Sequence, residues 1–151
     1  MRRARQPDDA GTILLLTIGL SVVLMLLVVV VVDVSVVVLA KRGVSNAADG
    51  AALAAAQQAD EAVINDPHRD DALASRLPLD PVLVAQVVAT YQSDAAQSQP
   101  NLTLTPSVEG PGSFEAVVDA QRTVQLPFLS WFGIREVVVH SIGRARSPVA
   151  P

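Results

Sequence analysis

The sequence predicts an α+β protein. A single N-terminal transmembrane helix continues into a long helix, and a second helix and a small antiparallel sheet of about three strands follow. Three observations lead to this prediction. The run from Ile13 to Val32 is apolar and uncharged, and no proline occurs between Pro7 and Pro67. From Asn101 onward, apolar and polar residues alternate with the period of two that is typical of strands.

The apolar run is long enough to cross a membrane. From Thr12 to Ala40 it contains one charge, Asp33. Its uncharged part alone rises about 30 Å as a helix, which matches the hydrocarbon thickness of a bilayer. Three arginines among the first five residues precede the run, and Lys41-Arg42 follow it. The short basic tail and the acidic segment after the run favour an N-terminus in the cytoplasm and a C-terminal segment outside.

These features divide the chain into four parts. We expect a cytoplasmic basic tail over residues 1–11, a transmembrane helix over 12–40, an extracytoplasmic α+β domain over 41–146 and a disordered tail over 147–151. An alternative is a secreted soluble binding domain, released by signal peptidase after Ala40. The apolar run is longer than the core of about 7–15 residues that a signal peptide has, which favours an uncleaved anchor.

Asp33 is the one charge within the apolar run. If the span begins at Thr12, Asp33 lies at the outer interface, where its carboxylate avoids a cost of about 2.5–3.5 kcal/mol at mid-bilayer. There it can stay hydrated, or pair with Lys41 or Arg42 of a neighbouring copy. Two interpretations stay open, an interfacial carboxylate without a specific role and a contact to a partner protein.

The first helix is expected to continue to about Ile64. Gly43 and Gly50 are its weak points, because glycine costs up to about 1 kcal/mol relative to alanine. The alanine-rich surface between Ala47 and Ala56 allows another helix to approach closely. The alternative is that these alanines pack only on the chain's own domain.

A second helix is predicted after a charged connector. Asn65-Asp66-Pro67 ends the first helix, and residues 68–77 form the connector. Asp80-Pro81 is a typical helix start, with an N-cap followed by proline at the first helical position. Val84, Val87, Val88 and Tyr91 form an apolar stripe at helical spacing, and the helix ends before Pro100.

Three strands complete the predicted fold. The first begins at Asn101 and ends at a turn over Glu109–Ser113. The second covers Phe114 to Leu126, and the third covers Arg135 to Arg146. The loop between the last two strands holds Phe128, Trp131 and Phe132, in a chain with few aromatic residues.

This aromatic loop has two interpretations. In the favoured one, its side chains cap the sheet and pack on the second helix. In the other, they form an apolar surface for a partner or for the membrane interface, where tryptophan is enriched.

The composition argues against several classes of function. The chain has no cysteine, which excludes disulfides, zinc–thiolate sites and thiol nucleophiles. Its net charge of −4 argues against nucleic-acid binding, which needs clustered basic residues. We therefore expect no nucleic-acid partner.

No arrangement of residues in the sequence points to catalysis. Asp33 and Asp49 lie about 24 Å and about 160° apart on a continuous helix, too far for a carboxylate pair. His68 with Asp70-Asp71 lies in the connector, without a second histidine nearby, and His140 lies within a strand. No nucleophile elbow and no phosphate-binding glycine loop occurs. We therefore expect no enzymatic activity, no cofactor, no metal and no small-molecule substrate.

The N-terminal third of the chain resembles a known family. Gly11 precedes a long aliphatic helix, Val32-Asp33-Val34 and a basic pair follow, and the segment Ala47–Ala56 begins with Ala-Ala-Asp-Gly. This order and spacing resemble the N-terminal segment of the tight-adherence (Tad) pilus-assembly proteins, the TadE/TadG-like family. The chain departs from the prepilin pattern, because Leu16 stands five residues after Gly11 where prepilins have a glutamate.

The resemblance implies a pilin-like fold and a minor pseudopilin or accessory component in the assembly of a Flp-type pilus or a related secretion machine. The implied partners are the lipid bilayer and other pilus-assembly proteins or pseudopilins. The residues expected to contact such partners are Asp33, Ala48, Asp49, Ala52, Trp131 and Phe132.

Overall fold

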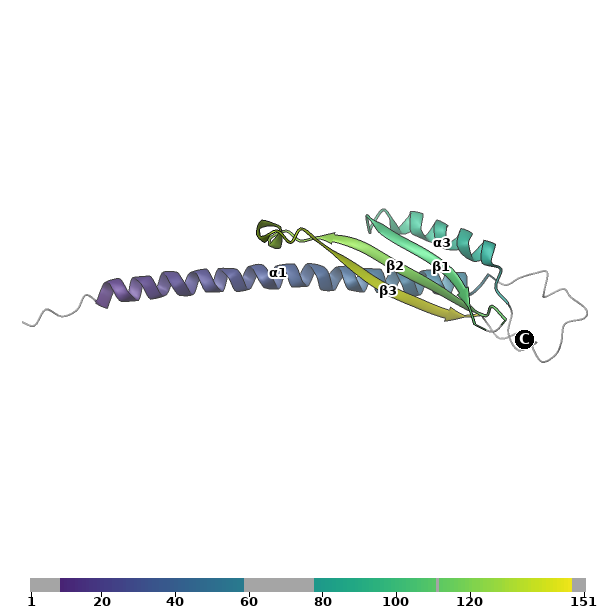
Figure 1. The fold of residues 1–151 in the computed structure, drawn as a ribbon, viewed down its shortest axis with the longest axis horizontal. Helices are drawn as coiled ribbons and strands as arrows, with labels where there is room; N and C mark the ends of the chain where they lie inside the picture. The colour runs from purple at the N-terminus through teal and green to yellow at the C-terminus, as the bar shows by residue number, and fades with distance from the viewer. Residues whose placement is uncertain (1–8, 59–77, 111, 148–151) are drawn as a thin grey trace, which may run out of the picture.

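The computed structural model describes residues 9–58, 78–110 and 112–147. Figure 1 shows one long helix with a small sheet and a second helix packed along its C-terminal half. This arrangement confirms the predicted α+β fold. The elements, in chain order, are α1 (Asp9–Ala55), α3 (Pro81–Ala95), β1 (Leu102–Glu109), β2 (Glu115–Gln125), the short 3-10 helix η2 (Leu129–Phe132) and β3 (Glu136–Arg146).

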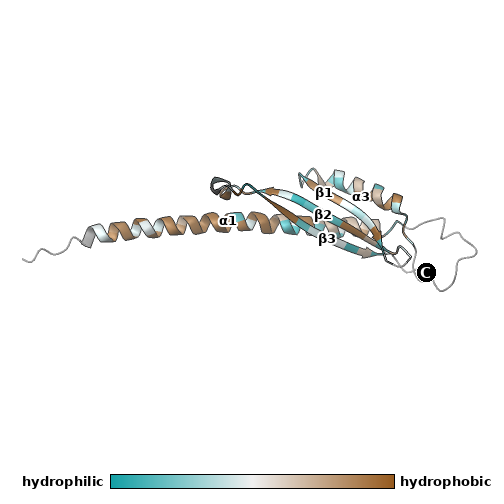
Figure 2. Ribbon diagram, viewed as in Figure 1, coloured by the Kyte–Doolittle hydropathy of each residue, from teal (hydrophilic) through white to brown (hydrophobic). Residues whose placement is uncertain are grey.

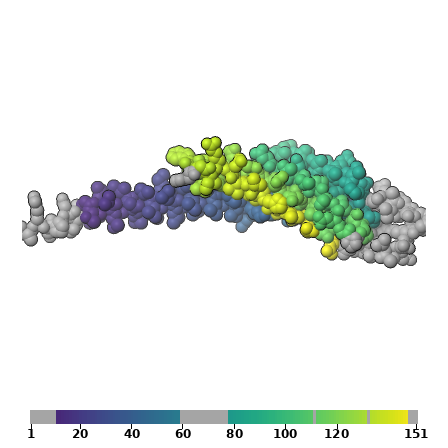
Figure 3. Space-filling model, viewed as in Figure 1, coloured from purple at the N-terminus to yellow at the C-terminus, as the bar shows by residue number. Residues whose placement is uncertain are grey.

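Helix α1 is continuous over 47 residues. It passes through Gly43 and Gly50 without interruption, as the absence of proline predicted. Its N-terminal half projects beyond the rest of the molecule, and Figure 2 shows that this half is almost entirely hydrophobic. The space-filling view in Figure 3 shows the same half emerging from the domain with little cover on the visible face.

The predicted end of α1 near Ile64 is wrong. The helix ends at Ala55, where the amide of Gln58 bonds to the Ala55 carbonyl at 3.0 Å and so tightens the last turn. The carbonyl of Gln58 then accepts a bond from the amide of Asp80 at 3.1 Å, which ties this end to the start of α3. The predicted stop and connector, residues 65–77, lie outside the described residues.

Helix α3 begins as the sequence predicted. The carboxylate of Asp80 accepts hydrogen bonds from the amides of Val82 and Leu83, and Pro81 occupies the first turn. Val84 and Val88 of the predicted stripe are buried. The helix ends at Ala95, before Pro100.

The sheet has the strand order β1-β2-β3, and both pairs are antiparallel. Helix α1 packs against β2 and β3, whereas α3 packs against β1 and against α1. Along β1 the apolar residues are buried or half-buried and the polar residues between them are exposed, as the predicted alternation requires. The two helices therefore cover one face of the sheet, and the core lies between this face and the helices.

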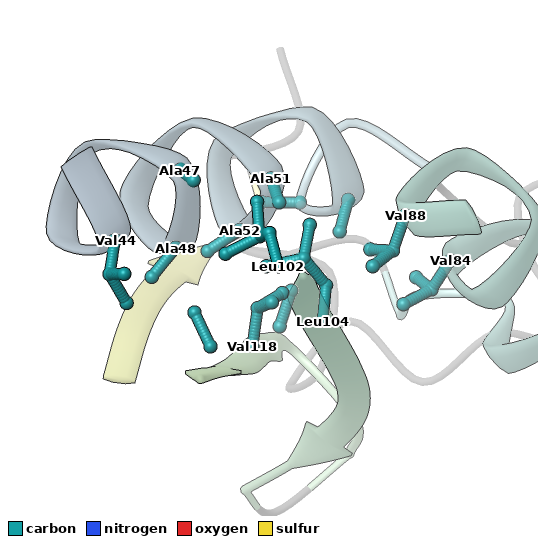
Figure 4. Close-up of a cluster of buried hydrophobic side chains, with 14 of the residues drawn as sticks. Val44, Ala47, Ala48, Ala51, Ala52, Val84, Val88, Leu102, Leu104 and Val118 are labelled. Carbon is teal, nitrogen blue, oxygen red and sulfur yellow. The ribbon is translucent and has the colours of Figure 1, made fainter. Parts of the chain in front are cut away.

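The core is made mostly of small side chains, shown in Figure 4. Small residues let α1 approach β3 closely. A Cβ atom placed on Gly143 of β3 would lie 2.2 Å from the carbonyl oxygen of Ala48. The side chains of Ser45 and Ser141 lie 3.0 Å apart, and Lys41 donates a hydrogen bond to the His140 carbonyl. The C-terminal half of α1 is thus part of the folded domain.

Candidate functional site

Within the described residues, α1 is the one helix long and apolar enough to cross a membrane. Its side chains from Ile13 to Val32 are exposed around the helix, apart from the half-buried Val29. Exposure of so much apolar surface to water is unfavourable, so a helix of this kind needs a lipid phase or another apolar surface to cover it. The structure is therefore compatible with a single-pass membrane anchor.

The surroundings of α1 change at Asp33. This side chain is 1% exposed, although the residues immediately before and after it are exposed. Val36 and Val37 pack against the core, and Ala40 is buried. The contacts that hold α1 to its own domain therefore extend from Asp33 to the end of the helix.

The loop between β2 and β3 buries the Asp33 carboxylate. Its Oδ2 atom accepts a hydrogen bond from the amide of Leu129 at 2.8 Å, and its Oδ1 atom accepts one from the amide of Phe128 at 3.3 Å. Hydrogen bonds to a charged acceptor are stronger than neutral ones, and two of them compensate for the removal of the carboxylate from water. Asp33 thus fastens the loop to α1.

This arrangement corrects one alternative for Asp33. The side chain is not a hydrated interfacial carboxylate, because the loop covers it. Sequence reasoning missed its partners, since the amides of Phe128 and Leu129 are backbone groups that leave no sequence signal. A contact between Asp33 and a partner protein stays a prediction.

The aromatic loop also differs from the favoured expectation. Trp131 is 89% exposed and Phe128 is about half exposed. Figure 1 shows η2 beyond the end of the sheet, beside the middle of α1, whereas α3 covers β1 further along. The prediction that these aromatic residues cap the sheet and pack on the second helix is therefore wrong for Trp131, because the loop lies at Asp33 and leaves this side chain exposed. The side chain of Phe132 lies outside the described part of the chain.

The loop is closed by its own backbone. The amide of Trp131 bonds to the Phe128 carbonyl at 3.2 Å, and the amide of Gly133 bonds to the Ser130 carbonyl at 3.2 Å. Gly133 has φ 90°, a left-handed conformation that glycine adopts without steric cost. An open groove of about 740 Å³ lies beside the loop, with Val36 and Arg135 among its lining residues.

The remaining candidate residues on α1 do not join this loop. Ala48 and Ala52 are fully buried in the chain's own core. Of the two alternatives for the alanine-rich surface, the structure therefore shows packing on the chain's own domain. Both alanines are corrected as partner contacts, because the sheet already covers them. Asp49 is exposed and stays available for a partner.

The structure brings together no catalytic set among the residues that it describes. These ranges contain no group of three or more His, Asp or Glu side chains that could hold a metal ion. His140 pairs with Asp119 at 2.7 Å on the exposed face of the sheet. The predicted candidates His68 and Asp70-Asp71 lie outside the described residues.

One comparison with known proteins gives a match. Residues 11–58 match the family model described as "Putative Flp pilus-assembly TadE/G-like". The matched segment runs along α1, so it includes the exposed apolar half, Asp33 and the buried alanines. No curated protein and no solved structure matches the chain. Over its N-terminal segment the chain is therefore similar to the TadE/G-like Flp pilus-assembly proteins, as its residues predicted, and this similarity supports a part in pilus assembly.

Proposed function

We propose that the protein is a membrane-anchored minor pseudopilin or accessory component in the assembly of a Flp/Tad-type pilus or a related secretion machine. One observation carries this proposal. The family match covers a single helix that has two different environments, an exposed apolar half and a half buried in a domain. Such a helix connects a folded domain rigidly to a membrane.

The proposed topology places the N-terminus in the cytoplasm. Residues 1–11 form the basic tail, α1 crosses the bilayer from Thr12, and the α+β domain lies outside. The arginines near the N-terminus support this orientation, because basic residues are retained on the cytoplasmic side. The domain contacts begin at Asp33, so the domain includes the end of the span predicted over 12–40.

The proposed role is structural rather than catalytic. The matched family is described by pilus assembly and not by a reaction. Its proposed partners are the bilayer and other pilus-assembly proteins or pseudopilins. Asp49 is the best candidate for a protein contact, because it is charged, exposed and located on the matched helix.

Release of the domain after Ala40 is the alternative. Ala40 is buried in the middle of α1, and a cut after it would remove Asp33, Val36 and Val37 from the domain. The loss of these contacts favours an uncleaved helix. The mass of the mature protein distinguishes the two, because cleavage after Ala40 removes the entire apolar run.

Deletion of the gene, followed by complementation, tests the proposal. We expect the deletion strain to lose surface pili and the wild-type chain to restore them. A matched pair of variants then tests the partner contact: Asp49→Asn, on α1, should reduce co-purification of pilus-assembly proteins, whereas Asp94→Asn, an exposed acid on α3, should not. Normal piliation in the deletion strain would contradict the proposed function.

A further inference from the structure

The connection between β2 and β3 carries an exposed aromatic surface that the fold itself does not use. Trp131 is 89% exposed, and Phe128 and Ile134 are each about half exposed. Leu126, at the start of the same connection, is buried and anchors it to the sheet. We call the segment from Phe128 to Ile134 the aromatic loop.

The position of the aromatic loop along α1 is fixed by Asp33. Both carboxylate oxygens bond to amides at the start of the loop, so the loop lies at the level of Asp33 on the helix. Figure 1 shows the loop as the part of the domain that reaches furthest along α1 toward its N-terminus, apart from α1 itself. The loop is therefore the part of the domain nearest to the apolar half of α1.

The same residue marks the expected boundary of the bilayer. The uncharged run from Ile13 to Val32 rises about 30 Å, the thickness of the hydrocarbon core. When this run occupies the bilayer, Asp33 and the loop bound to it lie at the outer interface. The length of the run thus gives the depth of Asp33, and the hydrogen bonds of Asp33 place the loop at that same depth.

The chemistry of the loop fits this depth. An indole ring has an apolar body and one N–H donor, and tryptophan is enriched where membrane meets water. The exposed apolar side chains of α1 run from Ile13 past Asp33 to Val34, Val38 and Leu39, so apolar surface lies on the helix on both sides of the level at which Asp33 holds the loop. A lipid surface that surrounds the helix would cover the loop without any further partner.

We propose that the aromatic loop is a second membrane contact, in which Trp131 and Phe128 enter the outer interfacial layer of the bilayer that α1 crosses. Asp33 is the positioning residue that holds the loop at this depth. The domain is then fixed to the membrane at two points, the helix and the loop. These two contacts restrict the tilt of the domain relative to the bilayer more than the helix alone would. This inference goes beyond the proposed role in pilus assembly and requires only that α1 is inserted.

Trp131 is the chain's only tryptophan, so its fluorescence reports on the loop directly. The full chain is reconstituted into phosphatidylcholine–phosphatidylglycerol vesicles, and flotation confirms its insertion. We expect blue-shifted emission, strong quenching by lipids brominated near the glycerol end of the acyl chain, and weak quenching by aqueous acrylamide. Strong acrylamide quenching would overturn the proposal. Protection from both quenchers would also overturn it, since a second protein chain would then cover the loop.

A matched control moves the tryptophan along the chain. The double variant Trp131→Phe, Ile142→Trp places the single indole at a half-exposed position on the outer face of β3. Its emission should be quenched by acrylamide and not by the brominated lipid. Asp33→Ala should shift the quenching of Trp131 toward acrylamide, because the loop is no longer held at the interface. An unchanged quenching pattern in an inserted, folded Asp33→Ala protein would exclude Asp33 as the positioning residue.

Discussion

The Oδ2 atom of Asp33 lies 2.8 Å from the backbone nitrogen of Leu129, 96 residues further along the chain. This hydrogen bond joins the point where α1 enters the domain to the connection between the last two strands. It places a buried carboxylate at the boundary between the apolar half of α1 and the folded domain. The first prediction tests its contribution to stability.

Asp33→Ala should lower the free energy of unfolding of the domain by about 1–3 kcal/mol, because two amides lose their acceptors. Asp33→Asn should cost less, since the amide oxygen keeps one acceptor. Chemical denaturation in detergent micelles measures both effects, and hydrogen exchange at Phe128 and Leu129 locates them. The control is Ser35→Ala, an exposed change two residues away that should stay within about 0.5 kcal/mol. Wild-type exchange at both amides in Asp33→Ala would contradict the prediction.

Gly143→Ala should destabilise the domain strongly. The added Cβ would meet the backbone of Ala48 at 2.2 Å, and backbone cannot rotate away as a side chain does. Overpacking of this kind costs about 1–3 kcal/mol or more. The midpoint of thermal unfolding measures it. Gly19→Ala is the matched control, because nothing lies within 4 Å of its added Cβ. Equal midpoints for the two variants would show that α1 does not pack on β3 this closely.

Gly50→Ala should destabilise the domain through one particular neighbour. Its Cβ would lie 2.4 Å from the hydroxyl oxygen of Tyr91 on α3. Removing that hydroxyl with Tyr91→Phe should recover part of the loss, so the two changes should couple by about 0.5–3 kcal/mol in a double-mutant cycle. Additive effects of the two substitutions would mean that α1 and α3 are not in contact at this point.

The proposed topology predicts opposite accessibilities at the two ends of α1. The chain has no cysteine, so a single introduced cysteine is labelled specifically. In intact cells, a maleimide that reaches the outer side of the cytoplasmic membrane but does not cross this membrane should label a cysteine at Leu53, an exposed residue of the domain. It should not label a cysteine at Ala4. Labelling of Ala4→Cys alone would reverse the orientation.

The sequence by itself determined the elements whose signals are local. The uncharged run up to Val32 identified a helix long and apolar enough to cross a membrane, because a bilayer imposes a length and a composition. Asp80-Pro81 identified the start of α3, because an N-cap and a proline act on neighbouring amides. The alternation after Asn101 identified the strands, and the spacing of Asp33 and the alanine-rich segment identified the family resemblance.

Only the tertiary structure decided what covers each surface. The alanines of α1 are compatible with a partner helix and with the chain's own sheet. They pack on the sheet, because Gly143 has no side chain and the backbone of Ala48 can lie directly against it. The loop with Trp131 lies beside Asp33 and not beside α3, because two backbone amides of the loop donate hydrogen bonds to the buried carboxylate of Asp33. Such amides are present at nearly every residue, so the sequence does not indicate which of them a distant side chain will bind. Local patterns fix helices and strands, whereas long-range hydrogen bonds and close backbone contacts depend on the whole fold.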